Sequence, residues 1–201
     1  MFGVTVTERC HMLLRPHLHT GDLVVDCTAG NGHDTRFLAR CVGPRGKVLA
    51  FEIQEQAANK LRKKIAKEYP QVMVVCGNFT SLEEVLRDSA GGEGVIPEPA
   101  VIVYNLGWLP GGDHSFTTKA EETIASVRQA LRLVKPEGVV SIITYPGHEE
   151  GLREEREITA LLSELPSDEY EALTIRQTNR GINCPVQHIV LRRRLQEEER
   201  D

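Results

Sequence analysis

Apolar segments of strand length alternate with helical segments along nearly the whole of this 201-residue chain. The pattern predicts strands near residues 22–27, 46–52, 72–76, 100–105, 138–144, 170–177 and 186–193. It predicts helices near residues 34–42, 54–68, 81–88, 118–134 and 149–164, where apolar residues recur at helical spacing. Alternation of this kind favours a mostly parallel sheet with helices on both faces. The chain is therefore expected to have an α/β fold.

The last two predicted strands depart from this alternation. Only the turn-prone segment Thr178-Asn179-Arg180-Gly181-Ile182-Asn183 lies between them. Parallel neighbours need a crossover of a dozen or more residues, so these two strands are expected to pair antiparallel.

Capping residues predict two of the helix starts. Thr7 is the expected N-cap of an opening helix that runs to about Leu18. Thr118, with Glu121 three residues later, predicts a capping box at the start of helix 118–134. The sequence contains no repeat or low-complexity linker, so we expect one domain over residues 1–195. Within it, residues 1–20 form an N-terminal helical segment, and residues 196–201 are expected to fray.

Composition limits the location and the chemistry of the chain. No apolar run approaches the roughly 18 residues of a membrane span, and the N-terminus lacks a signal pattern, so a cytoplasmic location is expected. The five cysteines form no Cys-x-x-Cys pair, and the histidines show no metal-ligand spacing. We therefore predict no disulfide framework and no metal site. Cys27 and Cys76 are interpreted as small core residues.

The strongest candidate site is the segment Asp26-Cys27-Thr28-Ala29-Gly30-Asn31-Gly32-His33-Asp34-Thr35, which joins an apolar strand to a helix. A glycine turn between a strand and a helix brings backbone N–H groups close to a ligand at the carboxyl edge of the sheet. Glu52 ends the next apolar run. A carboxylate at that position is suited to hold the two hydroxyls of a ribose.

Two nucleotide cofactors are compatible with this geometry. A dinucleotide site requires a third glycine where this chain has Thr35, and the acidic groups of Asp26 and Asp34 would repel a pyrophosphate. S-adenosylmethionine has no phosphate, and its sulfonium and ammonium groups are attracted by nearby acids. The pattern favours S-adenosylmethionine, with a nicotinamide site and a ligand-free turn as the alternatives.

The order of these parts resembles the class I S-adenosylmethionine-dependent methyltransferases over residues 20–193. The resemblance implies a Rossmann-like, seven-stranded, mostly parallel sheet whose last strand is antiparallel. It also implies that the glycine turn wraps the methionine end of the cofactor, that Glu52 holds the ribose, and that Asn78 contacts the adenine. Asn78 is equally interpreted as a loop residue that bonds its own backbone. The implied cofactor residues are Asp26, Thr28, Gly30, Asn31, Gly32, Asp34, Thr35, Glu52, Gln54 and Asn78.

A second candidate stretch, Asn105-Leu106-Gly107-Trp108-Leu109-Pro110-Gly111-Gly112-Asp113, follows the strand at 100–105. It is similar to the Asn/Asp-Pro-Pro-aromatic motif of amino-directed methyltransferases in its first and fourth positions, but lacks the two prolines. An attacking amine needs acceptors for its N–H groups, which the Asn105 oxygen and the Leu106 carbonyl could supply. Trp108 could stack on the flat part of the substrate. The alternative is a plain Gly/Pro-rich loop.

A third stretch, Tyr145-Pro146-Gly147-His148-Glu149-Glu150-Gly151, follows the strand at 138–144 and is expected at the same edge of the sheet. Tyr145 and His148 could line the substrate pocket, and His148 could accept a proton because imidazole titrates near neutral pH. His148 could equally form a bond at the start of the next helix.

Taken together, the three stretches resemble one narrow family of tRNA methyltransferases, long labelled rRNA methylases. These enzymes convert 5-aminomethyl-2-thiouridine at the wobble position of tRNA to its 5-methylaminomethyl form. The resemblance implies the anticodon stem-loop of tRNA as the partner. It implies a site made of Asn105, Trp108, Asp113, Tyr145 and His148, the candidates for proton uptake being Asp113, Tyr145 and His148.

The net charge of the chain is compatible with substrates other than tRNA. The chain carries 24 basic and 29 acidic residues, for a net charge of −5, which favours a small substrate over RNA unless the late arginines gather beside the pocket. These are Arg176, Arg180, Arg192, Arg193 and Arg194. A methyltransferase acting on the nitrogen of rRNA or of a small molecule, and a catalytically silent RNA-binding module, remain alternatives. A homodimer is also open.

Overall fold

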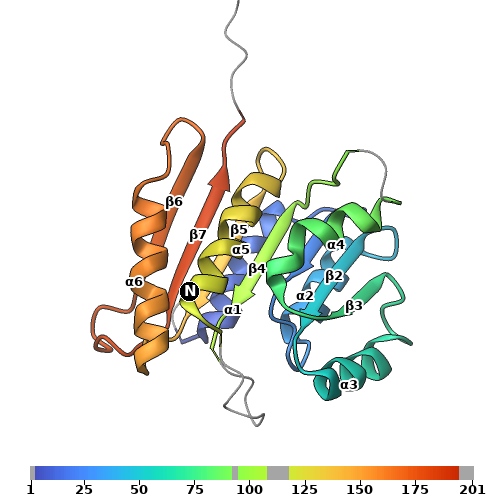
Figure 1. The fold of residues 1–201 in the computed structure, drawn as a ribbon, viewed down its shortest axis with the longest axis horizontal. Helices are drawn as coiled ribbons and strands as arrows, with labels where there is room; N and C mark the ends of the chain where they lie inside the picture. Colours follow the sequence, from blue (N-terminus) through green and yellow to red (C-terminus); the bar gives the residue numbers. More distant parts are fainter. Residues whose placement is uncertain (1–2, 92–94, 108–117, 195–201) are drawn as a thin grey trace, which may run out of the picture.

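A seven-stranded sheet forms the centre of the protein in the computed structural model, which describes residues 3–91, 95–107 and 118–194 (Figure 1). The strand order is β3-β2-β1-β4-β5-β7-β6. The strands are β1 (Leu23–Asp26), β2 (Lys47–Glu52), β3 (Val72–Cys76), β4 (Val101–Asn105), β5 (Val139–Thr144), β6 (Tyr170–Ile175) and β7 (Val186–Arg192). Strands β1 to β5 pair in parallel, and β7 runs antiparallel to both β5 and β6. This confirms the predicted Rossmann-like sheet.

Helices cover both faces of the sheet, as the alternation predicted (Figure 1). They are α1 (Val6–Leu14), α2 (His33–Val42), α3 (Glu55–Ile65), α4 (Leu82–Ser89), α5 (Ala120–Leu133) and α6 (Glu149–Ser163), with short 3-10 turns η1 (Arg15–His17) and η2 (Phe79–Ser81).

Adjacent strand residues point to opposite faces, which divides the core into two layers. Val24 packs in a cluster with Leu14 of α1 and Leu38 of α2, whereas its neighbour Val25 packs in a cluster with Val127 of α5 and with residues of α4 and α6. Val24 and Val25 are both fully buried. Because both faces of the central strands are covered, these strands are mostly apolar.

The first helix begins two residues earlier than the sequence analysis expected. Its N-cap is Thr5 and not Thr7, because Glu8 lies three residues after Thr5 and completes a capping box with it. The Thr5 hydroxyl oxygen accepts from the Glu8 N–H, and the Glu8 carboxylate accepts from the Thr5 N–H. The α-helix ends at Leu14, and Pro16 lies in the 3-10 turn that follows, because proline cannot donate the next helical hydrogen bond.

Two further expectations about single residues are wrong. Thr118 forms no capping box, since α5 begins at Ala120 with Lys119 as its N-cap and without a side-chain cap. The Thr118 hydroxyl instead donates to Glu154 on α6. Cys76 is exposed and not a core residue, because it ends β3 at the edge of the sheet, whereas Cys27 is buried as expected.

Candidate functional site

A pocket of about 990 Å³ lies at the carboxyl edge of the parallel strands. Its walls come from the segments that follow β1, β2, β3, β4 and β5, together with the start of α1. This volume is at the upper end of ordinary small-molecule sites, and the edge where strand order reverses is where open α/β sheets bind ligands. Strands β1 and β4, on either side of that reversal, are direct neighbours.

The glycine turn after β1 needs both of its glycines, for different reasons. Gly30 has a φ of 50° and lines the pocket. Gly32 is the N-cap of α2 with a φ of 79°, and a Cβ there would lie 2.4 Å from Leu61 Cδ1 on α3. Left-handed backbone favours glycine at both positions. Gly32 therefore serves the close packing of α2 against α3, while Gly30 faces the pocket.

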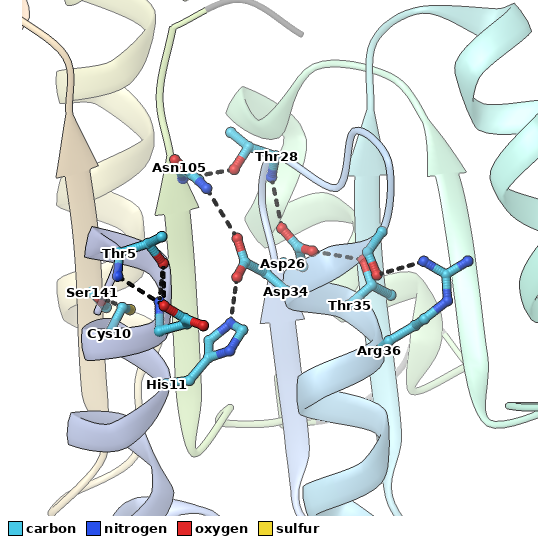
Figure 2. A network of polar contacts seen from close by, with 12 residues as sticks. Thr5, Cys10, His11, Asp26, Thr28, Asp34, Thr35, Arg36, Asn105 and Ser141 are labelled. Carbon is cyan, nitrogen blue, oxygen red and sulfur yellow. Dashed lines mark hydrogen bonds and ion pairs between the residues drawn. The ribbon is translucent and has the colours of Figure 1, made fainter. Parts of the chain in front are cut away.

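Asp26 lies beneath the turn, and the residues that line the pocket do not include it. Its side chain is fully buried, and its carboxylate accepts from Thr28 N at 3.1 Å and from Thr35 Oγ1 at 2.6 Å (Figure 2). Burial, and then the charge of Asp34, raise the pKa of Asp26 to about 7. Thr35 is equally buried. Asp26 and Thr35 therefore hold the shape of the turn from below.

Glu52 presents a carboxylate to the pocket on a backbone support. Its Oε2 accepts from Gly30 N at 3.0 Å, and its Oε1 accepts from Gln54 N at 2.8 Å. Burial raises the pKa of Glu52, while the two N–H groups act in the opposite direction. Gln54, Thr28 and Asn31 also line this part of the pocket. Because each carboxylate oxygen has a second lone pair, Glu52 can still accept from the hydroxyls of a ligand.

Asn78 lines the pocket, but both polar atoms of its side chain have partners within the chain. Its Oδ1 accepts from Thr80 N at 2.9 Å, and its Nδ2 donates to Glu122 at 2.8 Å. Of the two interpretations, the local backbone bond is the one that the structure contains.

Asn105, at the end of β4, is the centre of a network of side chains from separate elements (Figure 2). Its Nδ2 donates to Asp34 Oδ2 at 3.2 Å, and its Oδ1 accepts from Tyr145 Oη at 2.9 Å. Its backbone N–H donates to Thr28 Oγ1 at 2.7 Å. On the far side of Asp34, His11 Nε2 lies 2.6 Å from Oδ1. The fold thus brings Asn105, Asp34 and Tyr145 together as candidate site residues.

His11 was not expected at the site. It lies on α1 and lines the pocket beside Asp34. Nothing in the sequence linked residue 11 with residue 34. The contact depends on how α1 packs against α2, which only the folded chain determines.

His148 also lines the pocket and caps α6. Its Nδ1 accepts from Gly151 N at 3.1 Å, which is the bond at a helix start that was one of its two expected roles. A Cβ at Gly151 would lie 2.1 Å from the Tyr145 carbonyl oxygen. The glycine of this third stretch is therefore required by close approach of the backbone.

Trp108 and Asp113 lie outside the described residues. The residues on either side of that stretch are held together, since Gly107 N donates to Thr118 Oγ1 at 3.0 Å and Thr118 Oγ1 donates to Glu154 at 2.9 Å.

The late arginines lie at opposite ends of the strands, one group on the side of the pocket and the other on the side away from it. Arg176 and Arg180 lie in the β6–β7 connection, at the same edge as the pocket, because Ile175 pairs with Gln187 and Thr144 pairs with Val186. Arg192 and the two arginines after it lie at the opposite edge, beside the start of β5, where Arg192 N donates to the Gly138 carbonyl. Only the first pair could contact a substrate at the pocket edge.

Within residues 3–91, 95–107 and 118–194, no helix is both long and apolar enough to cross a membrane. The same residues contain no group of three or more histidines, cysteines and acids that could hold a metal ion.

Comparison with known proteins places the chain among methylases. A family model described as "Putative rRNA methylase" matches residues 48–191. The chain is 30% identical to the chloroplastic tRNA (mnm(5)s(2)U34)-methyltransferase of Arabidopsis thaliana over 88% of its own length, and it spans 65% of the length of that relative.

The fold is shared with many solved structures, among them the following two. One, from Clostridium thermocellum, has the same description as the family, with a TM-score of 0.86 at 25% identity, covering 96% of this chain and 100% of that one. The other, a "putative methyltransferase" from Streptococcus mutans solved in complex with SAH, has a TM-score of 0.80 at 22% identity, covering 94% and 98%.

Proposed function

This chain belongs to the rRNA methylase family, and on that premise we propose that it methylates the amine of wobble 5-aminomethyl(-2-thio)uridine in tRNA. The methyl donor is S-adenosylmethionine, and the product carries a 5-methylaminomethyl group. The observation that carries the proposal is the shared pocket of Glu52 and Asn105. One end of this pocket is suited to a ribose and the other to an amine.

The residues of the first end fit S-adenosylmethionine. Glu52 can accept from both ribose hydroxyls, because backbone N–H groups already hold its carboxylate in place. Gly30, which has no side chain, leaves backbone next to the pocket where a side chain would otherwise project. The bound cofactor supplies a methyl group on a positively charged sulfur, which suits a pocket whose acids include Asp34 and Glu52.

The residues of the second end fit an amine nucleophile. Asn105 Oδ1 accepts one hydrogen bond from Tyr145 and has a second lone pair for an N–H of the substrate. Burial, and then the charge of Asp34, raise the pKa of Tyr145, so Tyr145 remains protonated and acts as a donor. Transfer then depends on holding the nitrogen in line with the methyl group.

An alkylamine with a lysine-like pKa of about 10 is mostly protonated at pH 7, so the site must take up a proton. Tyr145, which remains a donor, is poorly suited to this role. The other two candidates are His148, whose Nδ1 would have to give up its bond from Gly151 N to take a proton, and Asp113, which lies outside the described residues.

The choice of tRNA as substrate is supported by the relative from Arabidopsis thaliana and by the arginines at the pocket edge. Arg176 and Arg180 are exposed there, although Arg176 also pairs with Glu155 at 2.8 Å. Single-stranded loop bases can be splayed into a pocket of this kind, which suits an anticodon nucleotide. The description of the family itself favours rRNA as the second candidate substrate.

Labelled S-adenosylmethionine separates these substrates. The purified protein is incubated with bulk tRNA from cells that lack the modification, with ribosomal RNA, and with a pool of small metabolites. Mass spectrometry of the digested nucleosides is expected to find the label in 5-methylaminomethyluridine. A label found in a ribosomal base or in a free metabolite instead would contradict the tRNA assignment, and transfer to none of the three pools would favour the silent RNA-binding module.

A further inference from the structure

The orientation of the Asn105 amide is set by Asp34 and Tyr145, and Asp34 is in turn held by His11, which neither the sequence motifs nor the proposed reaction assigns. An amide can present either its oxygen or its NH₂ group to a given side, so its neighbours decide which group faces the substrate. An ionised carboxylate only accepts hydrogen bonds. Asp34 Oδ2 therefore takes the Nδ2 side of Asn105, at 3.2 Å. The oxygen of the amide is left facing Tyr145 Oη, 2.9 Å away.

Asp34 is itself held from the side opposite to Asn105. His11 Nε2 lies 2.6 Å from Asp34 Oδ1, so a single carboxylate joins the two residues (Figure 2). The His11 ring stacks on Phe37, with centroids 3.9 Å apart and an interplanar angle of 5°. Phe37 lies on α2 one turn after Asp34. The same helix therefore fixes both the ring and the carboxylate that the ring contacts.

The pair is sheltered from solvent. The side chains of His11 and Asp34 are 21% and 12% exposed, unlike the exposed ion pairs that contribute little. Asp34 is also in the first turn of α2, where the helix dipole favours a negative charge. Two contacts thus orient the Asp34 carboxylate: the imidazole of His11 on one side and the amide of Asn105 on the other.

We propose that His11 and Asp34 are positioning residues that lock the Asn105 amide with its oxygen toward the substrate amine. This inference rests on the proposed function, because it concerns how that amine is held. In the locked orientation the amide oxygen accepts an N–H of the amine, so the nitrogen lone pair points toward the methyl group. A flipped amide would present an NH₂ group to the amine and would repel its N–H groups.

The test compares two replacements of His11. In His11→Gln the side-chain amide can still donate to Asp34, whereas in His11→Leu the bulk is kept and the donor is lost. With wobble-aminomethyl tRNA, His11→Leu is expected to lower kcat about tenfold, and His11→Gln to recover most of that loss. Affinity for S-adenosylmethionine, measured by titration calorimetry, should stay within about twofold for both variants, because neither touches Glu52.

Asp34→Asn provides a second, independent variant. An amide at position 34 can donate as well as accept, so it no longer dictates the orientation of Asn105. We expect kcat to fall at least as far as in His11→Leu, while thermal unfolding shows a folded protein. The pair His19→Leu and His19→Gln is the matched control, because His19 is 72% exposed and precedes β1 at the edge of the sheet opposite to the pocket.

The outcomes separate the two proposals. If the wild-type protein leaves the aminomethyl tRNA unmethylated, the proposed function is overturned and the positioning role falls with it. If the wild type is active and His11→Leu keeps the wild-type kcat, only the positioning role is overturned. Equal losses in His11→Leu and His11→Gln would also overturn it, since they would show that the donor at position 11 does not matter.

Discussion

The two ends of the pocket are built in different ways. At the Glu52 end, backbone N–H groups of Gly30 and Gln54 hold the functional carboxylate. At the Asn105 end, side chains from α1, α2 and the segment after β5 hold the functional amide. A site held by backbone tolerates changes of neighbouring side chains, whereas a site held by side chains depends on each of them. The two ends should therefore respond differently to substitution.

The largest expected effect is at the Glu52 end. Glu52→Ala removes the ribose acceptor and should weaken binding of S-adenosylmethionine by about 1.5–3 kcal/mol, the usual range for hydrogen bonds to a charged group. The fold should remain, because the side chain faces the pocket. Titration calorimetry measures the affinity, with Glu84→Ala on the exposed face of α4 as the control. An unchanged affinity would show that Glu52 does not bind the cofactor and would reopen the nicotinamide alternative.

Asn105→Ala should change turnover and not cofactor affinity, whereas Glu52→Ala changes cofactor affinity. It removes the amine acceptor and should lower turnover at least about tenfold, while cofactor affinity stays within about twofold. The physical reason is that the Asn105 side chain acts on the attacking nitrogen, while its contact with Thr28 of the Glu52 end is made by the backbone N–H, which alanine keeps. Single-turnover kinetics with aminomethyl tRNA, together with calorimetry, provides both numbers. A cofactor affinity that falls as far as turnover would mean that the two ends are not separate.

The buried carboxylate beneath the glycine turn predicts a pH dependence of stability. The pKa of Asp26 is raised to about 7 in the folded state, above its ordinary value near 4. The folded chain therefore binds more protons than the unfolded chain between these values. This group stabilises the fold at low pH and loses that contribution as pH rises toward 7, by at most about 1.4 kcal/mol per pH unit.

Asp26→Asn should remove this decrease in the free energy of unfolding with rising pH, because an amide keeps the shape of the side chain and does not ionise. Urea unfolding measured from pH 5 to pH 8 tests this, with the exposed Asp168→Asn as the control. Identical slopes for the wild type and for Asp26→Asn would contradict the assignment of Asp26 as a buried carboxyl that is protonated on folding.

The smallest expected effect compares the two edges of the sheet. Arg180→Ala, at the pocket edge, should weaken the use of tRNA severalfold and lower the salt dependence of that use by about one phosphate contact. Arg193→Ala, at the opposite edge, should change neither. Rates at sub-saturating tRNA over a range of salt concentrations provide the comparison. Equal effects of the two variants would show that the RNA does not bind at the β6–β7 connection.

Much of the fold was predictable because its signals are local. Each strand and helix shows its own apolar period, and the short link between β6 and β7 leaves only antiparallel pairing. Two of the errors concern which group a threonine hydroxyl bonds. Glu8 selects Thr5 over Thr7 as the cap of α1, and Glu154 of α6 takes the hydroxyl of Thr118 that would otherwise cap α5. The first was readable from spacing, but the second involves residues 36 positions apart.

By itself, the sequence determined the alternation of elements, the glycine turn and the position of Glu52 at a strand end, because these depend on neighbouring residues and on backbone geometry. The tertiary structure alone decided which acids face the pocket. Asp26 and Asp34 are eight positions apart and look alike in the sequence, yet one is buried beneath the turn and the other meets His11 and Asn105. The physical reason is that a strand end and a helix start point their side chains in different directions, and that the packing of α1 against α2 brings His11 to Asp34.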